Sequence, residues 1–576
     1  MTLTRIPGKD AALEESITRL QGQLKKLGFD IEEVSWRNPA PYCWSVHIHD
    51  RHCPLLFTNG KGSSRMAALA SALGEFFERL STRYFFADYY YGKIDRNTPA
   101  HHPDERWFPI PDDDTWPQQL LADPALRSFY DPEGELPASS LVDLNTGNSA
   151  RGICTLPFTR QRDKTPVWFP VNIIGNLYVS NGMSAGNTRD EARVQALAEI
   201  FERAIKFRII AEGIALPDIP AIVLARYPHI EASIAALRQA GYGILLKDAS
   251  LGGKYPVINV TLLNREDGSC FASFGAHPQF EVALERTVTE LLQGRDLDSL
   301  HGFSEPSFDR IEVASPLNLE THFIDSSGLI AWDFFKSTPD HAFSDWNFSG
   351  TTAEEYAFLC NILHEEGYEI YCRDMNHLGV DTCRIIVPGF SEIYPVEDLQ
   401  WDNNNAAITL RDRILNISTL PAEALFLLAQ ELEEHGFDQQ QPVAALIGLA
   451  PDSDGTWETL RVGELELLLA IRQQDWATAI DQLQWVLQYG QADTTTLNRY
   501  RCLLNLLSLR RDQGQQAGQY RAALQALHGA DILRQCEGML QGRGIFDHLP
   551  PPGDHMENTI THRKLLEALQ LTRKPQ

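Results

Sequence analysis

The sequence lacks the cysteine patterns that mark several classes of protein. Its nine cysteines lie at positions 43, 53, 154, 270, 360, 372, 383, 502 and 536, and no two of them form a Cys-x-x-Cys pair. This spacing indicates neither a disulfide framework nor a zinc ribbon, and it offers no cluster of three or four cysteines for an iron–sulfur centre. We therefore expect buried thiols, and any radical chemistry would have to belong to a partner.

Long apolar runs and an excess of basic charge are also missing. No stretch approaches the roughly 20 apolar residues that span a bilayer, and residues 1–16 contain no apolar core of the signal-peptide type. We therefore expect a cytoplasmic protein without membrane contact. The chain has 50 Lys and Arg against 77 Asp and Glu, a formal net charge of −27. Such a balance argues against direct binding of nucleic acid through a basic surface, and it suits a basic protein partner.

What the sequence does contain is an acidic row on a predicted helix. Thr188 followed by Glu191 has the spacing of a capping box, so the helix is expected to begin there, with Ser184 in the preceding loop. Within an arc of roughly 80°, its polar side is formed by Glu191, Gln195, Glu199 and Glu202, with Arg203 at the edge. A single row of this kind is usually a solvated face, so one copy alone would not indicate a site.

A second stretch repeats the pattern, and a third adds to it. Both of the first two end in Glu, an aromatic or aliphatic residue, Phe, Glu and Arg. Residues 65–81 place on one face Ser71, Glu75, Glu78 and Arg79; residues 281–295 place on one face Arg286, Glu290 and Gln293. The stretch 65–81 contains four alanines and one glycine, so other backbone can approach this helix closely and its carboxylates would need cations. Glutamates with flanking arginines suit a polyphosphate bridged by magnesium.

These motifs resemble the signature of the YcaO family. The spacing of Ser71 to Arg79 and of Ser184 to Arg203 fits it, and so do Asn59-Gly60-Lys61-Gly62 and the segment 283–295, so that the resemblance covers roughly residues 1–400. Family membership implies ATP and Mg²⁺ as cofactors, bound at a non-Walker site, and ATP-dependent activation of a peptide amide oxygen.

The resemblance also implies roles for individual residues, although it identifies no catalytic residue. Metal ligands would be Glu75, Glu78, Glu199 and Glu202. ATP-binding residues would be Lys9, Ser71, Arg79, Ser184, Glu191, Gln195, Arg203, Arg286 and Glu290. Lys9 precedes a predicted helix at 10–27, where a lysine could meet a phosphate; an ordinary exposed lysine is the alternative.

Helical and strand patterns alternate up to about residue 400 and then give way to helices alone. The expected class is therefore α+β: a YcaO-type duplicated α/β core over 1–400 with its acidic helices on sheets, interrupted by a loop-rich insertion at 83–150. An all-α domain over 401–576 would follow, with helix pairs similar to tetratricopeptide repeats, which serve as binding or dimerisation surfaces.

The chain end lacks the proline-rich tail of azoline-forming family members, so it is more similar to the stand-alone clade with a helical C-terminal domain. That clade is associated with β-methylthiolation of an aspartate in a small-subunit ribosomal protein, as an accessory to a radical-SAM methylthiotransferase. The resemblance thus implies these two partners, and we expect a homodimer. Two functions stay open: an ATP-hydrolysing, amide-activating enzyme, or an ATP-binding adaptor whose helical domain recruits partners. A metal-dependent hydrolase that works without ATP is a third.

Overall fold

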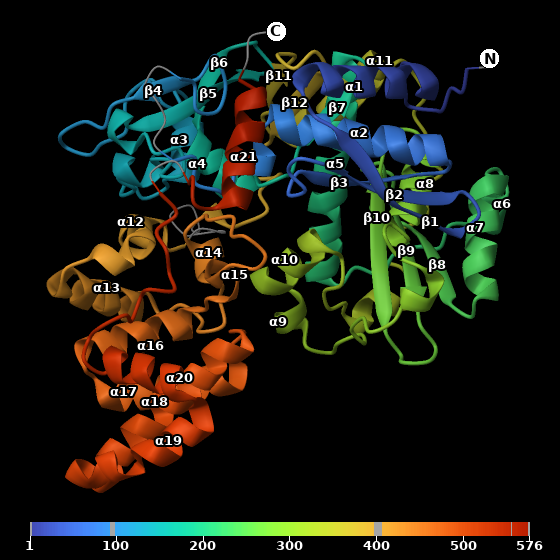
Figure 1. Cartoon of the computed structure of the whole chain (residues 1–576). Helices are drawn as coiled ribbons and strands as arrows, with labels where there is room; N and C mark the ends of the chain where they lie inside the picture. The colour runs from blue at the N-terminus through green and yellow to red at the C-terminus, as the bar shows by residue number, and fades with distance from the viewer. Residues whose placement is uncertain (1–2, 93–97, 397–405, 554–555, 574–576) are drawn as a thin grey trace.

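The computed structural model describes residues 3–92, 98–396, 406–553 and 556–573 (Figure 1). It has a mixed α/β body and a helical region that extends from the body as an arm. The predicted α+β class with a helical second part is confirmed. The predicted boundary between the two parts, at residues 400 and 401, lies outside the described residues.

The first layer of the body is a three-stranded antiparallel sheet with two helices. Its strands, in the order β1-β2-β3, are β1 (Ile31–Ala40), β2 (Cys43–Asp50) and β3 (Phe57–Gly62). Its helices are α1 (Leu13–Leu27), which ends at the left-handed Gly28, and α2 (Arg65–Ser81), which Ser64 caps. The helix predicted at 10–27 and the acidic helix predicted at 65–81 are thus both present.

Two further sheets complete the body. One is antiparallel in the order β10-β9-β8, formed by β8 (Gly243–Asp248), β9 (Val257–Leu263) and β10 (Cys270–Ala276). The other, in the order β4-β5-β11-β12-β7 with β6 beside β5, is formed by β4 (Arg106–Phe108), β5 (Ile153–Arg160), β6 (Pro166–Pro170), β7 (Met183–Gly186), β11 (Tyr371–Met375) and β12 (Asp381–Ile386). The long helix α5 (Arg189–Glu212) packs on both, against β7, β12 and β10.

The remaining helices of the body surround these sheets. They are α3 (Pro124–Tyr130), α4 (Val171–Ile173), α6 (Ala221–Leu224), α7 (Pro228–Gln239), α8 (Phe280–Leu291), α9 (Arg310–Val313), α10 (Pro316–Ile324) and α11 (Thr352–Glu365). After β6, residues 171–178 form a short helical segment. One local prediction was wrong. Ser184 lies in β7, not in a loop, because β7 pairs with β12 at Cys383.

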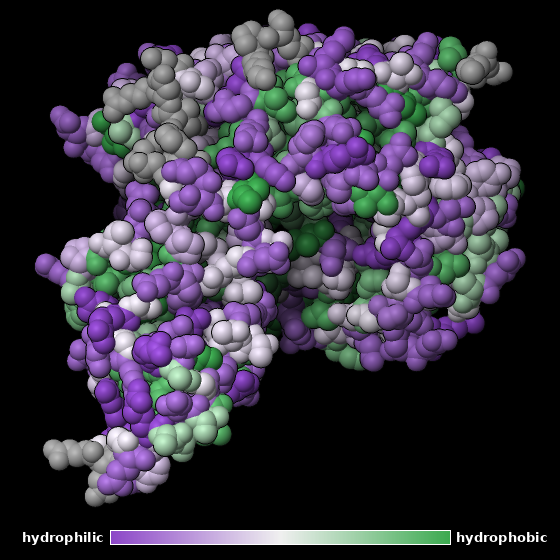
Figure 2. Space-filling view, viewed as in Figure 1, coloured by the Kyte–Doolittle hydropathy of each residue, from purple (hydrophilic) through white to green (hydrophobic). Residues whose placement is uncertain are grey.

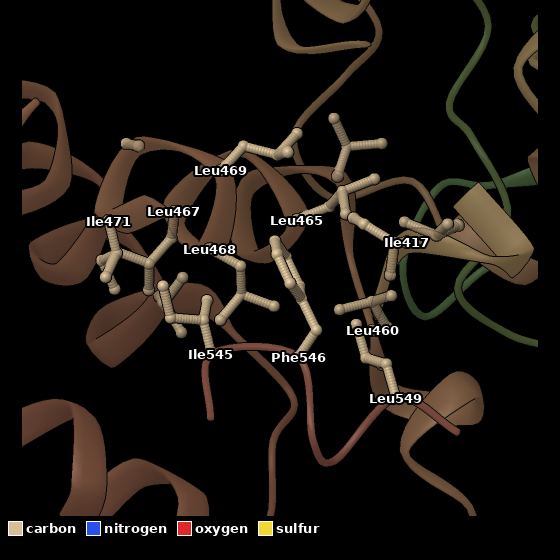
Figure 3. Close-up of a cluster of buried hydrophobic side chains, with 14 of the residues drawn as sticks. Ile417, Leu460, Leu465, Leu467, Leu468, Leu469, Ile471, Ile545, Phe546 and Leu549 are labelled. Atoms are coloured by element: carbon tan, nitrogen blue, oxygen red, sulfur yellow. The ribbon is translucent and has the colours of Figure 1, made fainter. Parts of the chain in front are cut away.

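The arm is a stack of helices around a core of its own. Its helices are α12 (Arg411–Leu415), α13 (Ala422–His435), α14 (Val443–Leu446), α15 (Thr456–Thr459), α16 (Val462–Gln473), α17 (Trp476–Tyr489), α18 (Thr494–Gln513), α19 (Arg521–His528) and α20 (Ala530–Met539). Figure 3 shows how Ile545, Phe546 and Leu549, which follow α20, pack beside the leucines of α16. In the described parts of the chain, no helix combines the length and apolar character that a bilayer crossing requires.

The last helix, α21 (Ile560–Leu571), leaves the arm and returns to the body (Figure 1). Its Leu565, Ala568 and Leu569 are buried in the same core as Phe76 and Phe77 of α2. His562 links the two parts, because its ring nitrogens bond the Ala450 amide at 2.9 Å and the Tyr90 carbonyl at 2.7 Å. The division of the chain at residue 400 stays a prediction, and any division has to count this helix with the body.

Candidate functional site

The residues that the sequence singled out line a single cavity of about 970 Å³ in the body. They come from the segment before α1 and from α2, β7, α5 and α8, which lie far apart in the sequence. The lining includes Lys9, Ser71, Glu75, Glu78, Arg79, Ser184, Glu191, Gln195, Glu199, Glu202, Arg203, Arg286 and Glu290. The structure thus brings all thirteen together, while the role of each stays a prediction.

Close packing of β3 on α2 forms one wall of this cavity. A Cβ atom on Gly60 would lie 2.0 Å from the Ala68 carbonyl oxygen, and one on Gly62 would lie 2.6 Å from the Ala67 Cβ. Any larger residue would therefore push strand and helix apart. Because the two glycines flank Lys61, this contact carries the lysine into the cavity.

The other wall is α5, whose start and apolar face follow from the sequence. The Thr188 hydroxyl accepts a hydrogen bond from the Glu191 amide and caps the helix. On the side away from the cavity, Val194, Leu197 and Ile200 are buried. This apolar face holds the helix against the sheets, so its carboxylates must face the cavity.

Most acidic side chains of the cavity lie beside a cation. Glu75 pairs with Arg79, and Glu290 with Lys61. The equivalent pair on α5 joins Glu199 to Arg203 with 3.2 Å between Oε1 and Nη1, and Glu202 lies 3.8 Å from Arg286 of α8. The cations thus offset part of the repulsion between carboxylates gathered in one place.

The cations do not offset all of the repulsion between the carboxylates, as the pKa values of two carboxyl groups show. Burial raises the pKa of Glu78 well above its ordinary value, and the charges of Glu199 and Glu75 raise it further. Burial also raises the pKa of Glu199, against the lowering effect of Arg203. A bound cation would relieve this repulsion, because it favours the ionised form of each carboxyl group.

The donor atoms in the cavity fit Mg²⁺ and a polyphosphate. Magnesium prefers carboxylate oxygens, and Glu75, Glu78, Glu199 and Glu202 supply them. Among the described residues that line the cavity, four side-chain atoms are buried without a hydrogen-bond partner: Glu199 Oε1, which faces Arg203 without a hydrogen bond, Arg79 Nε, Arg286 Nε and His322 Nδ1. A metal ion would satisfy the carboxylate oxygen, and phosphate oxygens would satisfy the two guanidinium donors.

The carboxylates are not yet arranged around a common point. Among the described residues, no group of three or more His, Cys, Asp or Glu side chains is placed to hold a metal ion. Three of the proposed metal ligands, Glu75, Glu199 and Glu202, lie beside arginines instead. Metal binding at this site would require the glutamates to leave those cations and rotate inward.

The segment before α1 closes one end of the cavity. Lys9 Nζ lies 3.2 Å from Glu191 Oε1, and the Asp10 amide donates to Glu191 Oε2 at 2.9 Å. Although burial raises the pKa of Glu191, the Lys9 charge and the hydrogen bonds from Asp10 and Asn187 hold it below its ordinary value. Lys9 is therefore not an ordinary exposed lysine, and Glu191 is ionised and anchors this segment.

Two lysines of the cavity were not predicted as site residues. Burial and the charge of Arg286 lower the pKa of Lys61 to about 8. Burial likewise lowers the pKa of Lys206 to about 8, and its Nζ donates to the His322 carbonyl at 2.5 Å and to Ser326 Oγ at 2.7 Å. The Gly-Lys-Gly sequence before α2 was a usable signal for Lys61, whereas nothing near Lys206 marked it.

Family models and known relatives match most of the chain. The family model "YcaO cyclodehydratase, ATP- and Mg²⁺-binding" matches residues 59–391, and "YcaO cyclodehydratase C-terminal domain" matches residues 407–574. The chain is 54% identical to the ribosomal protein S12 methylthiotransferase accessory factor YcaO of Escherichia coli K12, over 99% of this chain and 98% of that one. It is 51% identical to an uncharacterized protein of Haemophilus influenzae, over 98% and 97%.

Among solved structures, the chain resembles YcaO from Methanopyrus kandleri bound with AMPPCP and Mg²⁺. The TM-score is 0.41 at 18% identity, over 66% of this chain and 92% of that one. A heterocyclase in complex with substrate and cofactor gives a TM-score of 0.46 at 16% identity, over 71% of this chain and 57% of that one.

Proposed function

The chain belongs to the YcaO family, whose members bind ATP and Mg²⁺, and on that premise we propose that it assists the β-methylthiolation of a small-subunit ribosomal protein. The partner suggested by the E. coli relative is ribosomal protein S12, together with its methylthiotransferase. The observation that carries the proposal is the convergence of thirteen predicted residues from five segments on one cavity.

The proposed chemistry is phosphorylation of an amide-type oxygen on the acceptor protein. The oxygen attacks the terminal phosphorus of ATP, an O–P bond forms, and the bond from that phosphorus to the ADP oxygen breaks. The acceptor oxygen becomes a leaving group. When bound at Glu75, Glu78, Glu199 and Glu202, Mg²⁺ would neutralise phosphate charge. Arg203 and Arg286 would contact the phosphate oxygens through paired N–H groups.

The helical arm would serve association rather than chemistry. We propose that it mediates contact with a second copy of the chain or with the methylthiotransferase, because stacked amphipathic helices leave an outer face free for partners. A modification of a ribosomal protein would take place in the cytoplasm.

Turnover measurements test this proposal against an adaptor role. Purified chain is incubated with ATP and Mg²⁺, with and without S12 and its methylthiotransferase, and ADP release and the mass of S12 are measured. An amide-activating factor releases ADP faster when S12 is present. An adaptor binds ATP but shows no acceleration, and a metal-dependent hydrolase changes its substrate without ATP; either result would overturn the proposal.

A further inference from the structure

Exposed apolar side chains are concentrated beside the cavity, on and around α9 and α10. Four of the six most exposed large hydrophobic residues in the described chain lie here: Ile311 at 87%, Phe308 at 84%, Leu317 at 74% and Ile324 at 69%. The Phe308 ring stacks on the exposed Trp332 ring, with 5.8 Å between centroids. We call these five residues the α9–α10 patch. An apolar cluster of this kind on a protein surface marks an interaction site.

The charges around the α9–α10 patch are mostly negative. Residues 305–336 contain six acidic side chains and two cationic ones, Arg310 and Lys336. Both cations already lie beside Asp333, at 3.2 Å and 2.6 Å. The acidic side chains of this stretch are Glu305, Asp309, Glu312, Glu320, Asp325 and Asp333. An apolar patch with an acidic surround complements a polypeptide that carries both apolar and basic side chains.

The α9–α10 patch is continuous with the cavity. Ile324 belongs to both, since it is exposed and also lines the cavity together with its neighbour Phe323. The Phe323 ring lies 4.7 Å from the Arg203 guanidinium group, and Lys206 fixes the end of α10 through the His322 carbonyl. Figure 2 shows that the surface is hollowed between the arm and the body, in the area where Figure 1 places α10.

From these observations we propose that the α9–α10 patch is the docking surface for the acceptor protein, a basic polypeptide that enters the cavity past Ile324. This proposal rests on the proposed function, and it adds the surface where the acceptor protein docks. The occupant is free ribosomal protein S12, because ribosomal proteins carry basic charge for binding the RNA backbone. Binding of S12 to the α9–α10 patch would affect the proposed nucleotide site directly, because Phe323 contacts Arg203.

Two other occupants fit the charges less well. A second copy of this chain would bring its own acidic surround and its net charge of −27 against the same charges. Assembled ribosomal RNA would place phosphates there, with the same repulsion. A free basic protein is the partner that the electrostatics favour.

The test compares the double variant Ile311→Ser/Leu317→Ser with a matched control, Ile222→Ser/Ile560→Ser, whose side chains are 77% and 52% exposed elsewhere on the surface of the body. All variants are made in the whole chain, and none of the four positions lines the cavity. Three quantities are measured: affinity for free S12, ATP turnover with and without S12, and mass by light scattering. We expect the patch variant to lose tenfold or more in S12 affinity and to lose the acceleration by S12. Basal turnover and the control should stay within twofold of wild type.

The outcomes separate this proposal from the function on which it rests. If S12 binds and accelerates the patch variant as it does the wild type, the docking surface is wrong and the proposed function stands. If S12 neither binds nor accelerates the wild-type chain, both fail. If the patch variant keeps its S12 affinity but falls from dimer to monomer, the surface belongs to a second copy and the proposal is overturned.

Discussion

Helices α2 and α5 present the same row of side chains to the cavity, yet they are supported in different ways. Aligning their shared ends pairs Glu75 with Glu199 and Glu78 with Glu202. The α5 core is built from residues between 192 and 387. The α2 core combines α1 and the first sheet with α21, from the opposite end of the sequence. The repeated motif therefore specifies which polar groups line the cavity, while the apolar residues that hold each of the two helices in place lie in other parts of the sequence.

The environment of equivalent glutamates differs as well. Glu202 lies near Arg286 of α8, whereas burial and two neighbouring carboxylates raise the pKa of Glu78. A repeated motif thus predicts which atoms reach the cavity but not their protonation. The contributions of α2 and α5 can be distinguished experimentally by changing equivalent residues on the two helices.

The largest effect is expected for Glu78→Gln and Glu202→Gln. Each removes one carboxylate from the proposed magnesium site, so each should reduce Mg²⁺-dependent ATP turnover by roughly 100-fold or more, about 2.7 kcal/mol of transition-state stabilisation. Only Glu78→Gln should raise the melting temperature of the metal-free protein, by a few degrees, because it removes a buried carboxyl group whose ionised form the folded state disfavours. Calorimetry and product release measure both. Unchanged turnover in either variant would contradict the assignment of these carboxylates to the metal.

The second prediction concerns the support of α2 by α21. Leu569 is 1% exposed, so Leu569→Ala should destabilise the protein by about 2–5 kcal/mol through lost burial and a cavity. Leu527→Ala, at an exposed position of the arm, should cost less than about 0.5 kcal/mol. Denaturant unfolding followed by circular dichroism gives both values. Equal stability of the two variants would show that α21 is dispensable for the body.

The third change tests whether the arginine of α5 contacts phosphate. Arg203→Lys keeps the charge but loses the paired donors, so ATP turnover should fall roughly tenfold, about 1.4 kcal/mol. Steady-state kinetics with saturating Mg²⁺ measure this loss. Near-wild-type kinetics would mean that Arg203 only pairs with Glu199 and packs against Phe323.

The raised pKa values of Glu78 and Glu199 predict a pH dependence of metal binding. In the folded protein both groups retain protons to higher pH than in the unfolded chain, so the metal-free protein loses stability as pH rises through the folded-state pKa values. Mg²⁺ requires both groups ionised, so its binding releases protons and strengthens with rising pH. Calorimetric titrations in two buffers of different ionisation enthalpy, at about pH 6 and about pH 8, measure the release. Binding without proton release would contradict these shifts.

The smallest effect is expected for Lys9→Met. Lys9 is one-third exposed and pairs with Glu191 at the end of the cavity, so its loss should weaken ATP affinity by only a few fold, as expected of a partly solvated charge. Arg5→Met, outside the cavity lining, is the control. Titration with a fluorescent nucleotide measures the ATP-site affinity of both variants. Equal affinities would mean that Lys9 has only a structural role.

The sequence predicted the fold class, and for eleven of the thirteen cavity residues the signal was helical spacing, which places polar groups on a common face. Lys9 and Ser184 lie outside helices. The strand patterns that the sequence shows before residue 400 include β9 and β10, where β-branched and aromatic side chains are frequent. It missed the strand at Ser184, which forms only because a partner strand more than a hundred residues away in the sequence pairs with it. Lys206 was missed because its partners, a backbone carbonyl and a serine hydroxyl, lie more than a hundred residues away in the sequence and form no pattern with it.

The return of α21 to the body sets an order for protein synthesis. A ribosome makes α2 before the arm, but α21, which shares a core with Phe76 and Phe77, is made only after the arm. Until α21 emerges, the nascent chain must carry an open apolar surface beside a half-formed acidic cleft. The core of α5 needs no residue from beyond the arm, so α5 would reach its final packing before α2. The helix that is made first would therefore be the last to be fully packed.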